Sequence, residues 1–172
     1  MEQSIASLSP EQGQHALIIF YDLLPDELWE GGQKPSAAEL EYTAEQLQEG
    51  APENARPVVN ALLAEGSEEG KGETAKAVLD MFHTQELLRG FVEQAAQQAR
   101  QPHLAPIPLI IGAVIVILAV VPKEIKGKDW HIKWFDPKAL VDGLSTFVEK
   151  MPAGAWKALT PGMPRTPGDD SR

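Results

Sequence analysis

The four histidines are the residues of this sequence best suited to metal or proton chemistry. They are His15, His83, His103 and His131. They are widely separated, and none belongs to a ligand pair of the H-E-x-x-H type. Glu86 follows His83 at a spacing of three, but a di-iron bundle needs a second such pair and further glutamates on facing helices. We therefore predict no metal site and no cofactor.

Nucleophilic and phosphate chemistry also lack their sequence patterns. The chain has no cysteine, which excludes thiolate zinc sites, iron–sulfur clusters and thiol nucleophiles. It contains no G-x-S-x-G element, no G-x-x-x-x-G-K-[ST] phosphate loop and no G-x-G-x-x-G fingerprint. These absences favour a protein that is not an enzyme.

The charge of the chain is unevenly distributed. The 172 residues carry a formal net charge of −10, with 6 Lys and Arg against 18 Asp and Glu in residues 1–100, and 9 against 7 in residues 101–172. Nucleic-acid binding needs clustered cations, so we expect no nucleic-acid partner. The acidic front half is typical of the exposed surface of helices, and it also suits docking to a basic protein partner.

One uncharged apolar segment dominates the sequence. It runs from Leu104 to Pro122, and Leu, Ile or Val occupies twelve of its nineteen positions. As a helix it would reach about 28 Å, against a hydrocarbon core of roughly 30 Å. If the helix begins only at Pro108, it reaches about 22 Å and falls short of a full span. The residues predicted to insert into a membrane are Leu109, Ile110, Ile111, Val114, Ile115, Ile117, Leu118 and Val121.

Two other interpretations of the apolar segment remain open. A helix buried at the centre of a protein is also apolar on all faces. Nine positions of the segment are β-branched, and buried parallel strands show the same continuous Ile and Val.

A basic and aromatic stretch follows the apolar segment. Lysine, tryptophan and tyrosine concentrate at the headgroup level of membranes. The predicted membrane-interface residues are therefore Lys123, Lys126, Lys128, Trp130, Lys133 and Trp134. These lysines predict a cytoplasmic C-terminal side. The polar N-terminus shows no cleavable signal peptide, which favours the opposite orientation, so the orientation of a single-pass protein stays open.

Residues 1–100 are predicted to form an acidic helical bundle. Two capping boxes, Ser9 with Gln12 and Ser36 with Glu39, mark helix starts. Gly50 is expected to end the second helix in a left-handed conformation. The predicted elements are a helix from Pro10 that Pro25 breaks, a helix from residue 37 that stops at Gly50, and helices over 57–65 and 73–100, with a flexible loop over 66–72.

The C-terminal part is predicted to contain one further helix. Asp136 and Pro137 start an amphipathic stripe that ends before Pro152, and alternating aromatic residues over 130–134 also suit a short strand. The predicted organisation is an acidic helical bundle over 1–100, a Pro-rich hinge over 101–108, a hydrophobic segment over 104–122, a collar with an amphipathic helix over 123–151, and a disordered tail over 152–172.

The predicted fold class is therefore all-α, with a soluble N-terminal bundle, one hydrophobic and transmembrane helix, and a short amphipathic C-terminal helix. The corresponding function is a non-enzymatic membrane-associated interaction protein, whose acidic domain binds a protein partner while the hydrophobic helix anchors it. One alternative is a regulated membrane-disrupting effector, such as a bacterial defence effector, whose copies assemble through the hydrophobic helix. The other is a soluble structural or adaptor protein with 104–122 as its core.

Overall fold

The computed structural model describes residues 5–29, 32–64, 68–101, 110–120 and 137–161. All the secondary-structure elements within these residues are helices. The predicted all-α class is confirmed. The helices are α1 (Pro10–Leu23), α2 (Ala37–Gly50), α3 (Arg56–Leu63), α4 (Glu68–His83), α5 (Glu86–Ala99), α6 (Ile111–Val120), α7 (Pro137–Lys150) and α8 (Ala153–Leu159), with short 3-10 turns η1 (Ile5–Ser7) and η2 (Asp26–Leu28).

Both predicted capping boxes are present. The Ser9 hydroxyl accepts a hydrogen bond from the Gln12 amide at 3.1 Å, and the Gln12 side chain accepts one from the Ser9 amide at 2.8 Å. Ser36 and Glu39 make the same reciprocal pair, with both distances at 3.2 Å. These bonds satisfy amide groups that have no partner within the first turn of a helix, so α1 and α2 begin where the sequence places them.

The prediction for the end of α2 is wrong. Gly50 is the last helical residue, and Ala51 leaves the helix with φ −64° and ψ 139°. Pro52 follows Ala51, and the residue before a proline is driven toward extended conformations, so the chain exits without a left-handed residue. Gly32, with φ 73°, is the glycine of positive φ within the described residues.

The glycine-rich segment 66–72 is not a loop throughout, because α4 begins at Glu68. Gly70 and Gly72 are buried inside this helix. A Cβ at Gly72 would overlap the backbone of Pro10, and one at Gly70 would lie 2.7 Å from the Cα of Leu159. These glycines serve close helix crossings rather than flexibility.

The single helix predicted over 73–100 is two helices. The chain turns at Thr84 and Gln85, where the Thr84 hydroxyl donates to the Met81 carbonyl at 2.7 Å and the Gln85 amide donates to the Phe82 carbonyl at 3.0 Å. The turn folds α5 back so that both α4 and α5 pack against α1. As expected, α5 continues past Gly90.

The C-terminal helix α7 begins at the predicted proline and buries Leu144, Phe147 and Val148 of its predicted stripe. The disordered tail predicted from residue 152 is wrong for Ala153–Leu159, which form α8. Trp156 and Leu159, three positions apart, bury one face of α8, which packs on α4. An apolar pair at helical spacing was the available signal for this element.

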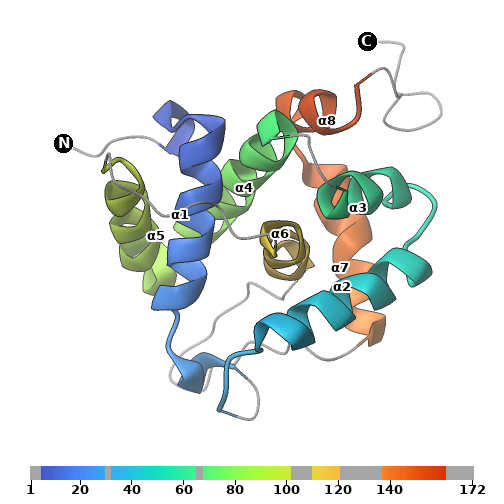
Figure 1. Ribbon diagram of the computed structural model, residues 1–172, viewed down its shortest axis with the longest axis horizontal. Coiled ribbons are helices and arrows are strands. Elements are labelled where there is room, and N and C mark those ends of the chain that lie inside the picture. The colour runs from blue at the N-terminus through green and yellow to red at the C-terminus, as the bar shows by residue number, and fades with distance from the viewer. Residues whose placement is uncertain (1–4, 30–31, 65–67, 102–109, 121–136, 162–172) are drawn as a thin grey trace.

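The helices form two groups with α6 between them (Figure 1). In the first group, α1, α4 and α5 pack on one another and α8 packs on α4. In the second, α2 packs on α3 and on α7. Helix α6 contacts both groups, and one continuous hydrophobic cluster joins them.

Within the described ranges, no helix is long and apolar enough to cross a membrane. Helix α6 accounts for ten residues of the apolar segment. Most of the predicted hinge, the predicted collar and the predicted strand over 130–134 lie outside the described residues.

Candidate functional site

Helix α6 is the most distinctive feature of the molecule, because it is apolar on every side and enclosed on every side. All residues from Ile111 to Ala119 are buried, and no apolar side chain among them is more than 4% exposed. A helix on the surface of a globular protein has one apolar stripe. The uniform apolarity of α6 therefore matches its position, since neighbours cover its whole circumference.

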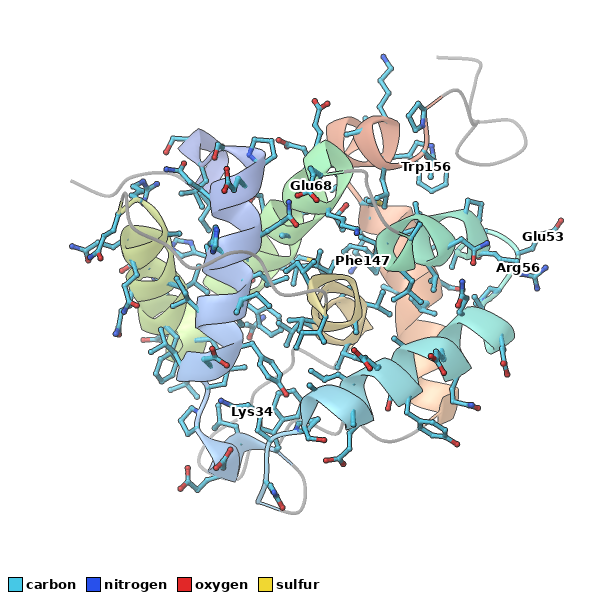
Figure 2. The ribbon with its side chains drawn as sticks, in the orientation of Figure 1. Lys34, Glu53, Arg56, Glu68, Phe147 and Trp156 are labelled. Carbon is cyan, nitrogen blue, oxygen red and sulfur yellow. The ribbon has the colours of Figure 1, made fainter. Side chains whose placement is uncertain are left out.

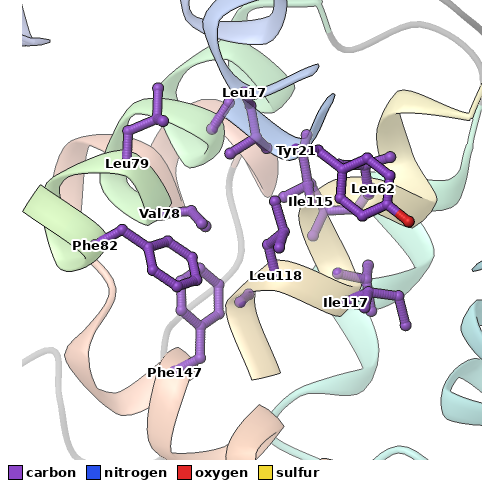
Figure 3. Close-up of a cluster of buried hydrophobic side chains, with 14 of the residues drawn as sticks. Leu17, Tyr21, Leu62, Val78, Leu79, Phe82, Ile115, Ile117, Leu118 and Phe147 are labelled. Carbon is purple, nitrogen blue, oxygen red and sulfur yellow. The ribbon is translucent and has the colours of Figure 1, made fainter. Parts of the chain in front are cut away.

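Five helices supply this cover: α1, α2, α3, α4 and α7. Figure 3 shows side chains from α1, α3, α4 and α7 gathered around those of α6. The labelled neighbours of Ile115, Ile117 and Leu118 are Leu17, Tyr21, Leu62, Val78, Leu79, Phe82 and Phe147. A helix buried at the centre of the protein was one of the open interpretations of the apolar segment, and α6 occupies that position. The sequence did not indicate which helices would surround it.

The closest approach to α6 comes from α3. A Cβ at Gly112 would overlap the carbonyl oxygen of Leu62 and would lie 3.0 Å from its carbonyl carbon and 3.5 Å from the Cα of Leu63. All three are backbone atoms, which cannot move without moving the helix. Glycine at this position lets the backbones of α3 and α6 meet directly.

The enclosure of α6 rests on apolar contacts. Its ten residues carry no polar side chain, so dispersion and the hydrophobic effect hold it in place. Full burial of a large aliphatic side chain is worth about 1.5–3 kcal/mol, so the six such side chains from Ile111 to Leu118 contribute on the order of 9–18 kcal/mol. This is comparable to the whole unfolding free energy of a typical domain, about 5–15 kcal/mol. Exposure of α6 to water alone is therefore strongly unfavourable.

The structure brings most of the predicted membrane-inserting residues together on α6. Ile110 is half-buried, and the buried ones are Ile111, Val114, Ile115, Ile117 and Leu118. Leu109 and Val121 lie outside the described residues, as do the predicted interface residues Lys123, Lys126, Lys128, Trp130, Lys133 and Trp134.

The two histidines in the described residues each lie near one glutamate. The His83 Nε2 atom lies 3.2 Å from Oε1 of Glu93 on α5, because the turn after α4 brings α5 alongside. The partner of His83 is therefore Glu93 and not Glu86. His15 lies 3.9 Å from Glu11, one helical turn away on α1. In the part of the chain that the structure describes, no three His, Asp or Glu residues could hold a metal ion together. His103 and His131 fall outside that part.

The outer face of α2 is acidic. Glu39, Glu41, Glu45 and Glu49 are all exposed, and α2 has no Lys or Arg. Tyr42, 58% exposed, lies on the same face. In Figure 2 the charged residues Glu53 and Arg56 lie at the outer edge of the molecule, whereas the apolar Phe147 lies toward α6. This exposed acidic face is thus the back of a helix whose inner face covers α6.

Two of the four tryptophans belong to the core. Trp29 is fully buried and lies edge-on to Tyr21, with ring centroids 5.8 Å apart. Trp156 is 6% exposed on α8. Both tryptophans therefore have a packing role in the part of the chain described.

Comparison with known protein families, with curated proteins and with solved structures finds no match for this chain.

Proposed function

We propose that this protein is a non-enzymatic, membrane-associating interaction protein that stores its hydrophobic helix inside the bundle and engages a bilayer once that helix is released. The observation that carries the proposal is the enclosure of α6, which is apolar on all sides and carries no polar side chain. Sequestration takes the place of a permanent anchor in this proposal, since the anchoring helix is part of the core.

Lipid is a suitable destination for α6 because acyl chains are as apolar as the side chains that now surround it. If α6 left the bundle for water, it would lose its apolar surroundings, whereas in lipid the acyl chains would replace them. The uncharged segment of the sequence also extends beyond the helix, over nineteen residues from Leu104 to Pro122. A core helix of ten residues needs only those ten to be apolar, whereas the full segment reaches about 28 Å as a helix, close to the thickness of a hydrocarbon core.

The outer face of α2 supports the protein-partner part of the proposal. Its four exposed glutamates have no cation on the same helix, and the exposed Tyr42 ring lies among them. A basic partner would find complementary charge and an aromatic contact on this face.

A vesicle experiment with the unaltered chain tests the membrane proposal. The protein is incubated with vesicles of phosphatidylcholine and phosphatidylglycerol that carry a photoactivatable diazirine lipid, over a series of urea concentrations below and through its unfolding transition. Bound protein is recovered by flotation, and cross-linked peptides are mapped after trypsin digestion. The apolar segment lies within one tryptic peptide, residues 101–123, because no Lys or Arg interrupts it.

We expect vesicle binding to begin below the unfolding transition, with cross-links concentrated in peptide 101–123. Failure to bind, or binding only after complete unfolding with cross-links spread over the chain, would overturn the proposal. That outcome would favour the second candidate, a structural protein in which α6 is only a core helix, an interpretation that the complete burial of α6 also suits. Release of a vesicle-trapped dye would distinguish a membrane-disrupting effector from an anchor.

A further inference from the structure

We infer that α2 and α3 act as one lid, residues 37–63, which swings away from α6 while α1, α4, α5 and α8 stay assembled. The inference gives the proposed function its release step and rests on that function for its purpose, but the opening itself is a property of the protein without lipid.

The first support is how the helical interfaces are divided. Among the described residues, α2 packs on α3, α6 and α7, and α3 packs on α2, α6 and α8. Neither has a comparable interface with α1, α4 or α5, which pack extensively on one another. The lid therefore packs on α6, α7 and α8 rather than on α1, α4 and α5, so separating it leaves the contacts among α1, α4 and α5 intact.

The second support is the distribution of polar contacts. Inside the lid, the side-chain amide of Gln48 donates to the side-chain oxygen of Asn60 at 3.0 Å, and the Arg56 guanidinium donates to the Ala51 carbonyl at 3.3 Å. These bonds join α2 and its following turn to α3. Within the described ranges, no side-chain hydrogen bond or ion pair joins residues 37–63 to another helix. The lid can thus open without breaking a directional bond.

Side-chain hydrogen bonds do link parts of the group that contains α1 and α4. The Lys76 ammonium donates to the Leu8 carbonyl at 2.9 Å, and the side-chain amide of the buried Gln14 donates to the Glu68 carbonyl at 3.1 Å. We therefore expect the separation of α1 from α4 to cost more free energy than the opening of the lid.

The segment just before the lid is fixed to α1 and supplies a hinge. The Tyr21 hydroxyl donates to the Pro35 carbonyl at 2.5 Å, and Lys34 donates through its side chain to the Asp22 carbonyl at 2.9 Å. Figure 2 places Lys34 at the base of the molecule, beside the start of α2. Because residues 34 and 35 are tied down and Ser36 is the N-cap of α2, rotation of the lid would occur around Ser36.

Gly112 provides the lever for a test, since it is where α3 and α6 meet backbone to backbone. In Gly112→Ala the new methyl group overlaps the Leu62 carbonyl oxygen, so α3 must move off α6. Gly90→Ala is the matched control, because a Cβ at Gly90 of α5 meets nothing within 4 Å. Both changes replace a helical glycine by alanine, so both change helix propensity in the same direction.

Amide hydrogen exchange in the absence of lipid reports which helices open. For Gly112→Ala we expect exchange over residues 37–63 to rise together by about tenfold or more relative to Gly90→Ala, with α1, α4 and α5 unchanged. A uniform rise over all these helices, a rise in α3 without α2, or no rise would overturn the inference.

Thiol labelling reports whether α6 becomes accessible, and the sequence has no cysteine whose thiol would compete for the label. Val116 lies one turn from Gly112, on the side of α6 that meets α3, whereas Val114 is two positions from Gly112 and therefore on the opposite side of the helix; both are fully buried. In the Gly112→Ala background, Val116→Cys should react with maleimide about tenfold faster than Val114→Cys. Equal rates would mean general unfolding and would contradict the lid.

A second pair of variants keeps the inference testable if Gly112→Ala does not fold. Leu47→Ala truncates a buried side chain on the inner face of α2, and Leu79→Ala truncates one on α4. Leu47→Ala should raise exchange in the lid alone, while Leu79→Ala should raise it in α1, α4 and α5; identical patterns would contradict the inference. Because these measurements use no lipid, a lid that opens while vesicles stay unbound would refute the proposed function and leave the lid standing.

Discussion

The crossing of α1 and α4 offers a sharp test of how the bundle is held together. In Gly72→Ala, the added methyl group would overlap the Cα and carbonyl oxygen of Pro10. A Cβ at Gly13, on the facing side of α1, would lie 2.9 Å from the Gly72 carbonyl oxygen. Because both obstacles are backbone atoms, the two helices must separate to admit even one methyl group.

The expected magnitude follows from two opposing terms. Overpacking of a tightly filled contact typically costs about 1–3 kcal/mol, and backbone obstacles place this site at the upper end. Replacing a helical glycine by alanine returns about 1 kcal/mol. We therefore expect Gly72→Ala to lower the free energy of unfolding by about 2 kcal/mol, whereas Gly90→Ala, which meets nothing within 4 Å, should raise it by about 0.5–1 kcal/mol.

Urea and thermal unfolding followed by circular dichroism measure both changes. The two variants should differ by about 3 kcal/mol, which for a domain of this size corresponds to a difference in Tm of roughly 6–12 °C. If Gly72→Ala were as stable as Gly90→Ala, the close crossing of α1 and α4 would be wrong, and residues 66–72 would be better described as the loop that the sequence predicts.

Three further changes probe separate parts of the fold. Ser36→Ala removes the hydroxyl that accepts from the Glu39 amide, so α2 should lose about 1 kcal/mol and exchange faster at its first turn in amide hydrogen exchange. Lys76→Met removes the donor to the Leu8 carbonyl and should cost about 1–2 kcal/mol in urea unfolding, with residues 5–8 the first to lose protection. Partial burial raises the pKa of Asp80 above its ordinary value of 3.8, although neighbouring cations lower it. The folded protein then binds this proton more tightly than the unfolded chain, so stability falls as pH rises through the interval just above 3.8. Asp80→Asn removes that fall, and its advantage over the unaltered chain should grow across this interval and level off toward neutral pH; a constant difference would contradict the argument.

The helix starts could be predicted because their causes are local. Ser9 and Ser36 make their capping bonds to residues three positions away, so the sequence contains both partners. The start of α7 is equally local, since it depends on a proline at the first helical position.

The errors arose where a residue's role depends on distant neighbours. Gly70 and Gly72 have the composition of a loop, and only the packing of Leu159 and Pro10 against them explains why they are helical. The break at Thr84 has no glycine or proline to announce it, and the return of α5 onto α1 stabilises it. The candidate site shows the same limit, because hydropathy identified the residues of α6 but not the five helices around it.

The enclosure of α6 has a consequence for any released state. The apolar stripes of α2, α3 and α7 face α6 and the surrounding cluster, with Leu47, Leu62 and Phe147 at most 3% exposed. If α6 moves into a bilayer, these stripes lose their cover and must find another, because exposing them to water would cost several kcal/mol per helix. Amphipathic helices satisfy that need by lying at a membrane interface. Release of α6 alone is therefore an incomplete description: on physical grounds, the lid and α7 should follow it to the lipid surface, whereas α1, α4 and α5 can keep most of their mutual contacts.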